Sequence, residues 1–514
     1  MRFCARQREN HTLSLALIYW GFDMGMIKRA GLVVGAIALI AGAIITYRTM
    51  NFAPADADTL KAVTLAVAPP FNINAATANL GAAIRFQTIS HQDKAENKID
   101  EWDRFHAWLQ STYPEVHGKM QREIVGEHAL LFHWQGSDPA LPPIILMAHQ
   151  DVVPVTEGTE KDWKYPPFSG LLAENAVWGR GSVDDKGTLI GLFEAFEALA
   201  KSGFTPKRSI YLVSGHDEEA GGSGAKAIAD LLAQRGIKAL FTIDEGSAVV
   251  RDAPIINGPA IMIGVAEKGY ATLRLTATAP GGHSSMPPKE TGVVNLAKAI
   301  VAINASPFPS ELKGPGVEMI STLAARGGTL VKMAAANAWA FSGVTLRTVG
   351  KTPSGAAMFH TTIAPTMLQG SPKENVLPQT ATALINYRIA PWNSSADVMA
   401  RAKAAVGKLP VTLDWVSPPR EPSPMSSTKS QGWALIAAAA AGQNPGAPIA
   451  PYLVVAGTDS RSFSGISQDV YRFMPAQFTI KETGMIHGTN EHMTIENLSR
   501  MINFYAQLIK TSAG

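Results

Sequence analysis

Short apolar runs alternate along the middle of the chain with segments in which apolar residues recur at helical spacing. The apolar runs span residues 143–148, 209–214 and 239–243 and have the length of buried strands. Residues 188–202 and 224–236 repeat apolar positions every three or four residues and run up to a glycine, a common end to a helix. Strands that alternate with helices are typical of a sheet covered on both faces, so the pattern predicts an α/β body with a mostly parallel sheet.

The pattern changes after residue 270. Residues 271–278 and 380–389 alternate apolar and polar side chains, as strands with one exposed face do, and residues 292–304 have the spacing of a helix. A Pro-rich segment at 418–422 then precedes a return to buried helix and strand character. We therefore predict that a smaller α+β domain is inserted into the large one.

These changes of pattern, together with an apolar run near the N-terminus, divide the chain into six segments. We predict an N-terminal cytoplasmic segment, a transmembrane anchor, a linker, the first part of the large domain, the inserted domain and the second part of the large domain. Their ranges are, in that order, 1–29, 30–48, 49–74, 75–268, 269–418 and 419–514.

The anchor prediction rests on residues 30–46, which contain no charged side chain and are just long enough to span a slightly thinned bilayer. Basic residues are concentrated before this run, whereas Asp56 and Asp58 follow it. The positive-inside rule then places the long C-terminal part on the non-cytoplasmic side, periplasmic or lumenal, of a single-pass protein. A cleaved signal peptide is the alternative, because residues 53–55 (APA) resemble a cleavage site.

Composition narrows the classes of function. The 514 residues are 46% hydrophobic and 17% charged with a net charge of +3, so the chain can bury two cores but lacks the positive field of nucleic-acid-binding proteins. We predict no nucleic-acid partner. Cys4 is the single cysteine, which excludes an intramolecular disulfide and a cysteine-rich metal site. Any bound metal must therefore be held by His, Asp and Glu.

Histidines and acidic residues stand at the ends of several predicted strands. Ligands of open α/β sheets bind beyond the carboxyl ends of the strands, so these residues should converge on one crevice. Adjacent carboxylates repel one another unless positive charge lies among them. Two histidines and several carboxylates without cysteine suit a pair of zinc-like ions joined by a bridging carboxylate. The residues are His149, Asp151, Asp184, Asp185, Asp217, Glu218, Glu219, Asp244, Glu245 and His487.

Together these segments resemble the M20 metallopeptidases. The apolar anchor, a long insertion in the smaller domain and the motif at 375–378 (NVLP) resemble the branch that contains carboxypeptidase S and the N-fatty-acyl-amino-acid hydrolases. The resemblance runs from about residue 75 to the C-terminus and implies a zinc-peptidase catalytic domain with an inserted lid domain of the dimerisation type. The motifs that carry it are His149-Gln150-Asp151, residues 179–187 (GRGSVDDKG), Asp217-Glu218-Glu219, Asp244-Glu245-Gly246, residues 281–284 (GGHS) and His487.

The resemblance implies two bound zinc ions. One would be held by His149, Asp184 and Asp244, and the other by Asp184, Glu219 and His487. Asp184 would then be the carboxylate that bridges the two ions. Co²⁺ or Mn²⁺ are alternative metals for ligands of this kind.

Two further residues beside the implied ligands have roles in the family. Asp151 would hydrogen-bond the far ring nitrogen of His149, and Glu218 would be the general base. Adjacent glutamates can divide such tasks because consecutive side chains point in different directions. In the implied reaction Glu218 takes a proton from a water that bridges the metals, the resulting hydroxide attacks an amide carbonyl, and Glu218 returns the proton to the leaving nitrogen.

The inserted domain would contribute substrate contacts. The resemblance implies that His283 stabilises the developing charge on the carbonyl oxygen, either from the partner subunit of a homodimer or by lid closure in a monomer. Asn375 and Arg388 would hold the substrate carboxylate, and Gly457 and Thr458 belong to a loop that lines the same pocket. The alternative interpretation makes these ordinary loop, turn and strand residues.

The main functional hypothesis is a membrane-anchored dizinc carboxypeptidase that removes C-terminal residues from short peptides. An N-acyl-amino-acid amidohydrolase of the aminoacylase type is the alternative, because it uses the same metals and carboxylate contacts, and the apolar segment 319–359 is compatible with an acyl pocket. A metal-free binding ectodomain is a third hypothesis, against which the presence of all five ligands and Glu218 argues. A dimetal phosphoesterase is disfavoured by the lack of a Gly-rich phosphate loop.

Overall fold

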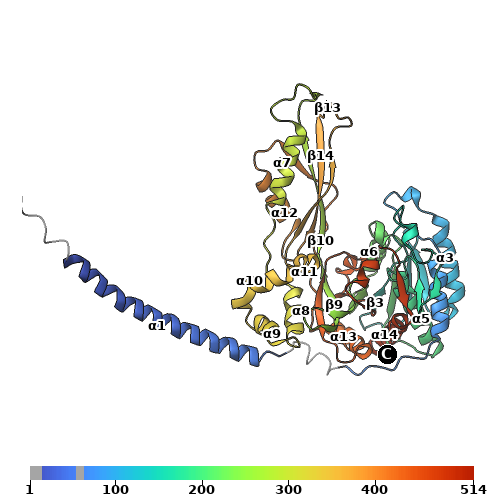
Figure 1. Cartoon of the computed structure of the whole chain (residues 1–514). Coiled ribbons are helices and arrows are strands. Elements are labelled where there is room, and N and C mark those ends of the chain that lie inside the picture. Colours follow the sequence, from blue (N-terminus) through green and yellow to red (C-terminus); the bar gives the residue numbers. More distant parts are fainter. Residues whose placement is uncertain (1–13, 54–62) are drawn as a thin grey trace, which may run out of the picture.

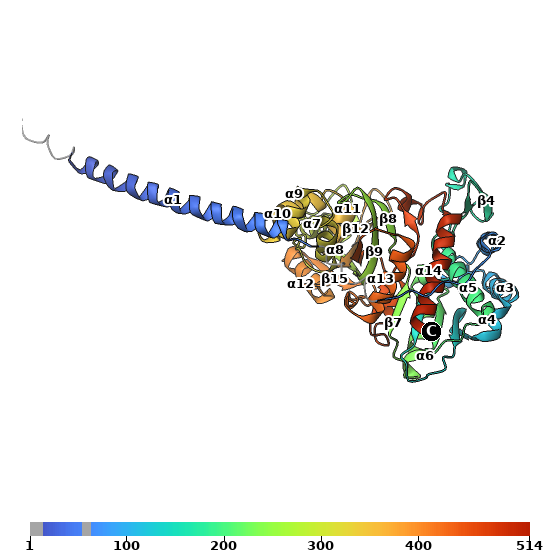
Figure 2. The same cartoon turned by 90° about the horizontal axis from the view of Figure 1, so that it is seen from below.

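The computed structural model of the chain describes residues 14–53 and 63–514. Its first element, α1 (Ser14–Met50), is a long helix that extends away from the rest of the molecule in Figure 1 and in Figure 2. Gly31–Met50 is long and apolar enough to cross a membrane, with a mean hydropathy of 1.9 and none of the apolar window buried, a description that an N-terminal signal sequence also fits. Cys4, residues 54 and 55 of the alternative cleavage site, Asp56 and Asp58 lie outside the described residues.

The main body is built on a ten-stranded mixed sheet. Parallel pairing runs through its centre from β6 to β17, and antiparallel pairs lie on both sides of that centre. The predicted α/β class with a large, mostly parallel sheet is confirmed. In spatial order the strands are β1 (Gln121–Val125), β2 (Ala129–Trp134), β6 (Ile210–Ser214), β3 (Ile144–Met147), β7 (Phe241–Asp244), β17 (Val470–Arg472), β9 (Gly258–Glu267), β8 (Val249–Ala253) and β18 (Gln477–Phe478), and β16 (Ile449–Val454) pairs with β9.

Helices cover both faces of this sheet, which explains its continuous apolar strands. In β3, Ile144 and Leu146 pack into the core on one face, whereas Ile145 and Met147 pack into the core on the other. The second face is covered by α6 (Ser223–Gln234). The first face is covered by α2 (Ile73–Ile84), α3 (Ile99–Thr112), α4 (Pro114–Lys119), α5 (Lys186–Lys201), α13 (Gln431–Gln443) and α14 (Ile495–Ala513), and Figure 2 shows α14 beside α5.

A second, four-stranded antiparallel sheet stands off the main body (Figure 1). Buried residues alternate along its two central strands and form a separate core with α7 and α12 on one face, as the alternating sequence pattern predicts. We call this part the small-sheet unit. Its elements are β10 (Gly269–Thr278), α7 (Gly292–Asn304), β12 (Thr362–Gln369), β14 (Thr380–Ile389), α12 (Ser395–Val406) and β15 (Val411–Trp415).

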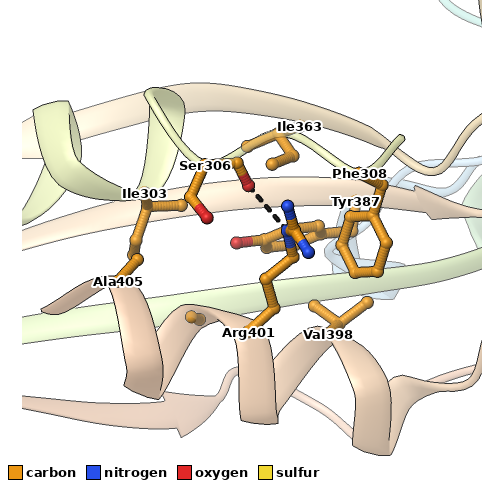
Figure 3. A pocket seen from close by; sticks show the side chains of 9 residues that line it. Ile303, Ser306, Phe308, Ile363, Tyr387, Val398, Arg401 and Ala405 are labelled. Atoms are coloured by element: carbon orange, nitrogen blue, oxygen red, sulfur yellow. Dashed lines mark hydrogen bonds between the residues drawn. The ribbon is translucent and has the colours of Figure 1, made fainter. Parts of the chain in front are cut away.

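Arg401 closes the space between α7 and α12 within the small-sheet unit. Its Nε donates to the Ser306 carbonyl at 2.9 Å, and its guanidinium lies 5.0 Å from the centre of the Phe308 ring (Figure 3). The side chain thus covers the apolar layer around Ile303 and Tyr387 while its charge is satisfied by backbone carbonyls and an aromatic face. This contact ties α12 to the segment that follows α7.

A third group of elements, which we call the helical insert, connects α7 to β12. The first helix of the insert packs on the main sheet, because Met319 and Leu323 share a core with Met262 of β9 and Leu453 of β16. The insert therefore belongs by packing to the main body, although it lies within the range predicted for the inserted domain. Its helices are α8 (Pro315–Ala324), α9 (Thr329–Ala336), α10 (Ala338–Val349) and α11 (Pro353–Ala357).

Candidate metal centre and active-site cleft

Four of the predicted metal ligands meet at the carboxyl edge of the main sheet. His149 Nε2 lies 2.9 Å from Asp184 Oδ1, and His487 Nε2 lies 3.0 Å from both Asp184 Oδ2 and Glu219 Oε1. Ligand atoms of His149, Asp184 and Glu219 all lie within 4.8 Å of one another. Asp184 thus contacts both imidazoles, which is where a bridging carboxylate would lie.

Asp244, the fifth predicted ligand, ends β7 at the same edge. β7 pairs in parallel with β3, with Ile243 opposite Leu146, so Asp244 and His149 follow neighbouring strands. The carboxylate of Asp244 accepts hydrogen bonds from the backbone N–H groups of Glu245 at 3.0 Å and Ser460 at 2.9 Å. Burial raises the pKa of Asp244, and the nearby His149 opposes this shift.

Asp151 holds the metal-facing loops together. Its Oδ1 lies 3.3 Å from His149 Nδ1, and its two carboxylate oxygens accept the backbone N–H groups of Glu218 and Glu219, each at 3.1 Å. Burial alone would raise the pKa of Asp151, but the hydrogen bond from His149 and the imidazole charge hold that pKa below its usual value. The residue therefore stays a carboxylate that orients both the His149 ring and the turn that carries the two glutamates.

Glu218 lies beside the candidate ligands and lines the cleft. It begins a short 3-10 turn, η4 (Glu218–Ala220), directly after β6 and Gly215-His216-Asp217. Burial raises the pKa of Glu218 well above its usual value, and the neighbouring carboxylates of Asp459 and Glu219 raise it further against the opposing effect of His149. A carboxyl group whose pKa is raised in this way binds a proton more readily than an ordinary glutamate, as a group that accepts and returns a proton must.

The charge around these residues is strongly negative. Both carboxylate oxygens of Asp185 and Oδ2 of Asp459 are buried without a hydrogen-bond partner in the part of the chain that the structure describes. Burial raises the pKa of Glu245, and the carboxylates of Asp184 and Asp185 add to that shift. Such a concentration of buried carboxylates is stable only beside positive charge, and imidazole with carboxylate ligands is a donor set for divalent, zinc-like ions. The residues present therefore fit a metal centre.

Protonation of His487 would be linked to metal binding. Hydrogen bonds to Asp184 and Glu219 raise the pKa of His487 to about 10. A metal ligand must be the neutral imidazole, so an ion that binds here would displace a proton. The affinity for metal should accordingly fall as the pH is lowered.

A buried ion pair that we did not predict joins the two loops that carry Asp184 and His487. Arg180 Nη1 donates to Glu491 Oε2 at 2.7 Å, and the two side chains are 2% and 0% exposed. Arg180 also donates to the His487 carbonyl, and Glu491 accepts the backbone N–H groups of Gly181, Val183 and Asp184 at 2.8–3.0 Å. Arg180 stands inside the quoted motif 179–187, but Glu491 is recognisable only by its place four residues after His487.

A cleft of about 1710 Å³ extends from the metal centre to the small-sheet unit and the helical insert. Asp184, Glu218, Glu219 and His487 line it, together with Gly457 and Thr458. The lining also includes a basic group and many apolar side chains. The basic residues are Lys268, Arg388, Arg420 and Arg461, and the apolar residues include Met319, Ile320, Leu323, Leu330, Val331, Val344, Val349 and Met358.

Lys268 and Arg388 form the centre of the basic group. Burial, with a smaller effect of the Arg388 charge, lowers the pKa of Lys268 to about 7, and burial also lowers the pKa of Arg388, with Arg461 and Arg420 as further causes. The Arg388 guanidinium lies 4.8 Å from the centre of the Tyr270 ring. Lys268 is buried, and its Nζ donates to the carbonyls of Ala357 and His360 at 2.9 and 2.8 Å. Cations that are buried or partly buried and repel one another favour an anionic ligand such as a carboxylate.

His283 and Asn375 lie elsewhere, at the tip of the small-sheet unit. His283 is in β11 (Gly282–His283), which pairs with β13 (Val376–Leu377), and the Asn375 carbonyl accepts the Ser284 N–H at 3.1 Å. Figure 1 shows β13 at the end of the unit far from the main sheet. The two residues are therefore close to each other but do not belong to the described lining of the cleft.

Comparison with known proteins gives consistent matches. Residues 145–511 match the sequence profile of peptidase family M20/M25/M40. The chain is 33% identical over 440 residues to the probable carboxypeptidase S-like 2 of Dictyostelium discoideum, covering 84% of each protein. It is 34% identical over 440 residues to the human N-fatty-acyl-amino acid synthase/hydrolase PM20D1, covering 84% of this chain and 87% of the human protein.

Solved structures show the same fold. The M20 family metallo-carboxypeptidase Sso-CP2 from Sulfolobus solfataricus superposes with a TM-score of 0.63 at 16% identity, covering 85% of this chain and 98% of that one. Human carnosine dipeptidase 1 superposes with a TM-score of 0.59 at 14% identity, covering 85% and 97%. At these identities the likeness concerns the arrangement of the elements.

Proposed function

Because the chain belongs to peptidase family M20/M25/M40, whose members include carboxypeptidases and fatty-acyl-amino acid hydrolases, we propose that it hydrolyses the amide bond of N-acyl amino acids. The amino acid carries a free carboxylate, and the acyl group is apolar. Membership of the family confirms the predicted resemblance and a metallopeptidase or amidohydrolase activity. The choice of acyl substrate is the finer part of the proposal.

One observation carries this choice, namely that three kinds of chemical group line the same cleft. They are the carboxylate and imidazole groups of the candidate metal centre, the basic residues around Arg388 and the apolar side chains of the helical insert. A substrate with a scissile amide, a carboxylate and a long apolar chain has a partner among all three kinds of group. A short, polar peptide would leave the apolar side chains without a partner.

The residues of this chain divide the proposed reaction among them. Divalent ions bound at the centre would polarise the amide carbonyl and lower the pKa of a bound water. Glu218 accepts a proton from the attacking water and passes it to the leaving nitrogen, for which its raised pKa is suited. Arg388 and Lys268 bind the substrate carboxylate, and Gly457 and Thr458 border the same part of the cleft.

His283 and Asn375 require a change of arrangement to act in this reaction. We include them in the site as residues brought to the cleft either by closure of the small-sheet unit or by the same unit of a second copy in a homodimer. Their mutual contact supports a shared movement, because Ser284 N–H binds the Asn375 carbonyl and the two strands pair.

A carboxypeptidase for short peptides, which is the main hypothesis from the sequence, is the second candidate function. It is supported by the names of related proteins, among them carboxypeptidase S of Saccharomyces cerevisiae, which is 31% identical over 486 residues and matches 85% of this chain and 84% of its own length. This function would use the same centre and basic group. It differs from the first candidate only in the group on the acyl side of the amide, which contacts the apolar side chains of the cleft.

Two substrates with the same leaving amino acid separate the candidates. N-dodecanoyl-leucine and glycyl-leucine offer the same carboxylate to Arg388, so a difference in kcat/KM reports on the acyl side alone. We expect kcat/KM to be at least about tenfold higher for the dodecanoyl substrate, because burying even a few methylene groups contributes more than 1.4 kcal/mol. The reverse order would favour the carboxypeptidase.

The control for this assay is Glu218→Gln. This variant should retain its metal content and hydrolyse neither substrate above about one thousandth of the wild-type rate, because only the proton-transfer group is lost. Hydrolysis that persists in the variant would point to a contaminating enzyme or to another base. Chelator added to the wild-type protein should abolish both activities.

We further propose that α1 anchors the protein in a membrane with the catalytic part on the non-cytoplasmic side. The support is an exposed apolar helix with Arg48 at its end and the basic residues that precede it in the sequence. The anchored form should remain with the membrane during alkaline carbonate extraction. A chain that begins after residue 50 on N-terminal sequencing would instead indicate cleavage of a signal sequence.

A further inference from the structure

Exposed apolar side chains gather on the two middle helices of the insert. Leu330 and Val331 on α9 are 76% and 38% exposed, and Trp339 and Val344 on α10 are 57% and 59% exposed. We call these four side chains the docking surface. Apolar patches of this kind mark contact with another molecule or with lipid.

The docking surface lies at the end of α1. α9 packs against α1, Arg48 Nε donates to the Ala336 carbonyl at 3.0 Å, and Asn337 Nδ2 donates to the Ile45 carbonyl and to Thr49 Oγ1 at 3.3 and 3.2 Å. Figure 1 and Figure 2 both show α9 and α10 beside this end of α1. The contacts therefore hold the two helices next to the point at which a membrane-spanning α1 would leave the bilayer.

The charge of the insert is consistent with a lipid surface. The sequence from Met319 to Lys373 contains no aspartate or glutamate. Lys332 on α9, Arg347 on α10 and Lys351 just after it are partly or fully exposed. Apolar and aromatic side chains bordered by Lys and Arg are the composition of helices that lie in the membrane interface, where the cations meet anionic headgroups.

We propose that α9 and α10 rest on the lipid bilayer beside α1, with the docking surface inserted among the lipids. Leu330, Val331 and Val344 also line the cleft, so the cleft opens at the membrane surface. An amphipathic substrate can then pass between bilayer and cleft without leaving an apolar environment. This consequence rests on the proposed function, whereas the docking itself does not.

Site-directed spin labelling of the full chain tests the docking. Cys4→Ser removes the single cysteine, after which Leu330→Cys and Trp339→Cys place a nitroxide on the docking surface. Met286→Cys and Val301→Cys are matched controls, because these apolar side chains are 80% and 68% exposed on the small-sheet unit. Each protein is placed, one copy per disc, in nanodiscs of phosphatidylcholine and phosphatidylglycerol.

Collision rates with oxygen, which partitions into lipid, and with a water-soluble nickel chelate are then compared. The ratio of oxygen to nickel collisions should be at least about fivefold higher at positions 330 and 339 than at positions 286 and 301. Equal ratios at all four positions would overturn the proposal. A raised ratio at positions 330 and 339 that appears only with two copies per disc would also overturn it, since a second chain would then cover the surface.

The readout does not involve catalysis, so failure of the docking and failure of the proposed reaction can be distinguished. If a label at position 330 or 339 lowers the midpoint of thermal unfolding, Val344→Cys is used in place of that position. If the protein docks on the bilayer but prefers glycyl-leucine over N-dodecanoyl-leucine, the docking proposal holds and the proposed substrate is wrong.

Discussion

At the scale of single residues, the candidate metal centre depends on side chains that position the predicted ligands as much as on those ligands. Asp151 binds the His149 ring and both backbone N–H groups of the Glu218-Glu219 turn. Glu491 binds three backbone N–H groups of the loop that ends at Asp184. Two carboxylates thus position residues from three separate loops before any ion is bound.

We predict that Glu491→Gln is far more harmful than Arg180→Met. Loss of the Glu491 charge leaves Arg180 buried without a counter-charge, which should cost about 3–5 kcal/mol of unfolding free energy and lower metal affinity about 10–100-fold. In Arg180→Met the Glu491 carboxylate keeps its three N–H donors. Thermal unfolding and metal titration of both variants measure the difference, and equal losses in the two variants would contradict this prediction.

At the scale of elements, α3 is tied to the ligand loop through one histidine. His106 Nε2 lies 2.7 Å from Gln150 Oε1, and Gln150 Nε2 donates to the carbonyls of His128 and Ser214 at 2.8 and 3.2 Å. Gln150 stands between His149 and Asp151, so the docking of α3 supports the same loop. A neutral His106 ring can donate this hydrogen bond to Gln150.

The pH dependence of stability should reflect this contact. Burial lowers the pKa of His106 to about 4, below the usual value near 6.5. The unfolded chain therefore takes up the proton first as the pH falls, and the folded state loses up to about 2 kcal/mol between about pH 7.5 and about pH 5. The variant His106→Gln should lose less unfolding free energy over this pH range, as measured by urea unfolding followed by tryptophan fluorescence. A loss in the variant as large as that of the wild-type protein would contradict this assignment.

Several elements were predictable because their own sequence decides them. α7 and β14 have the predicted bounds, and β3, β6 and α5 begin or end within two residues of theirs. A continuous apolar run is sufficient to identify a strand that is buried on both faces. A helical repeat of apolar positions is sufficient to identify a helix that is buried on one face. The packing of α8 on β16 and β9 was not predicted, because an apolar helix face does not indicate which sheet will cover it.

At the scale of the whole molecule, the position of the small-sheet unit determines whether the site is complete. The cleft is bordered by Arg388 of β14, but the tip that carries His283 lies at the other end of the unit. A second copy or a closing movement must supply that imidazole if it takes part in the reaction.

Mixing two inactive variants distinguishes these routes. If His283 comes from the partner subunit, His283→Ala combined with Glu218→Gln forms mixed dimers in which one of the two sites is complete, and about a quarter of the wild-type activity returns. If closure within one chain supplies the residue, the mixture stays inactive. The unmixed variants are the controls, and subunit exchange is checked with two affinity tags.

The sequence by itself determined which residues were candidates for one shared metal site. His149, Glu219 and Asp244 follow or end strands of one sheet and Asp184 precedes a helix, so their common edge groups them, whereas His487 lies between a 3-10 turn and a strand and was assigned by the family resemblance. The tertiary structure alone decided that Glu491 pairs with Arg180, that His283 stands away from the cleft, and that α9 lies against α1. The first and the third of these relations join residues 311 and 288 positions apart, and all three depend on how buried surfaces fit together, which no local pattern of residues encodes.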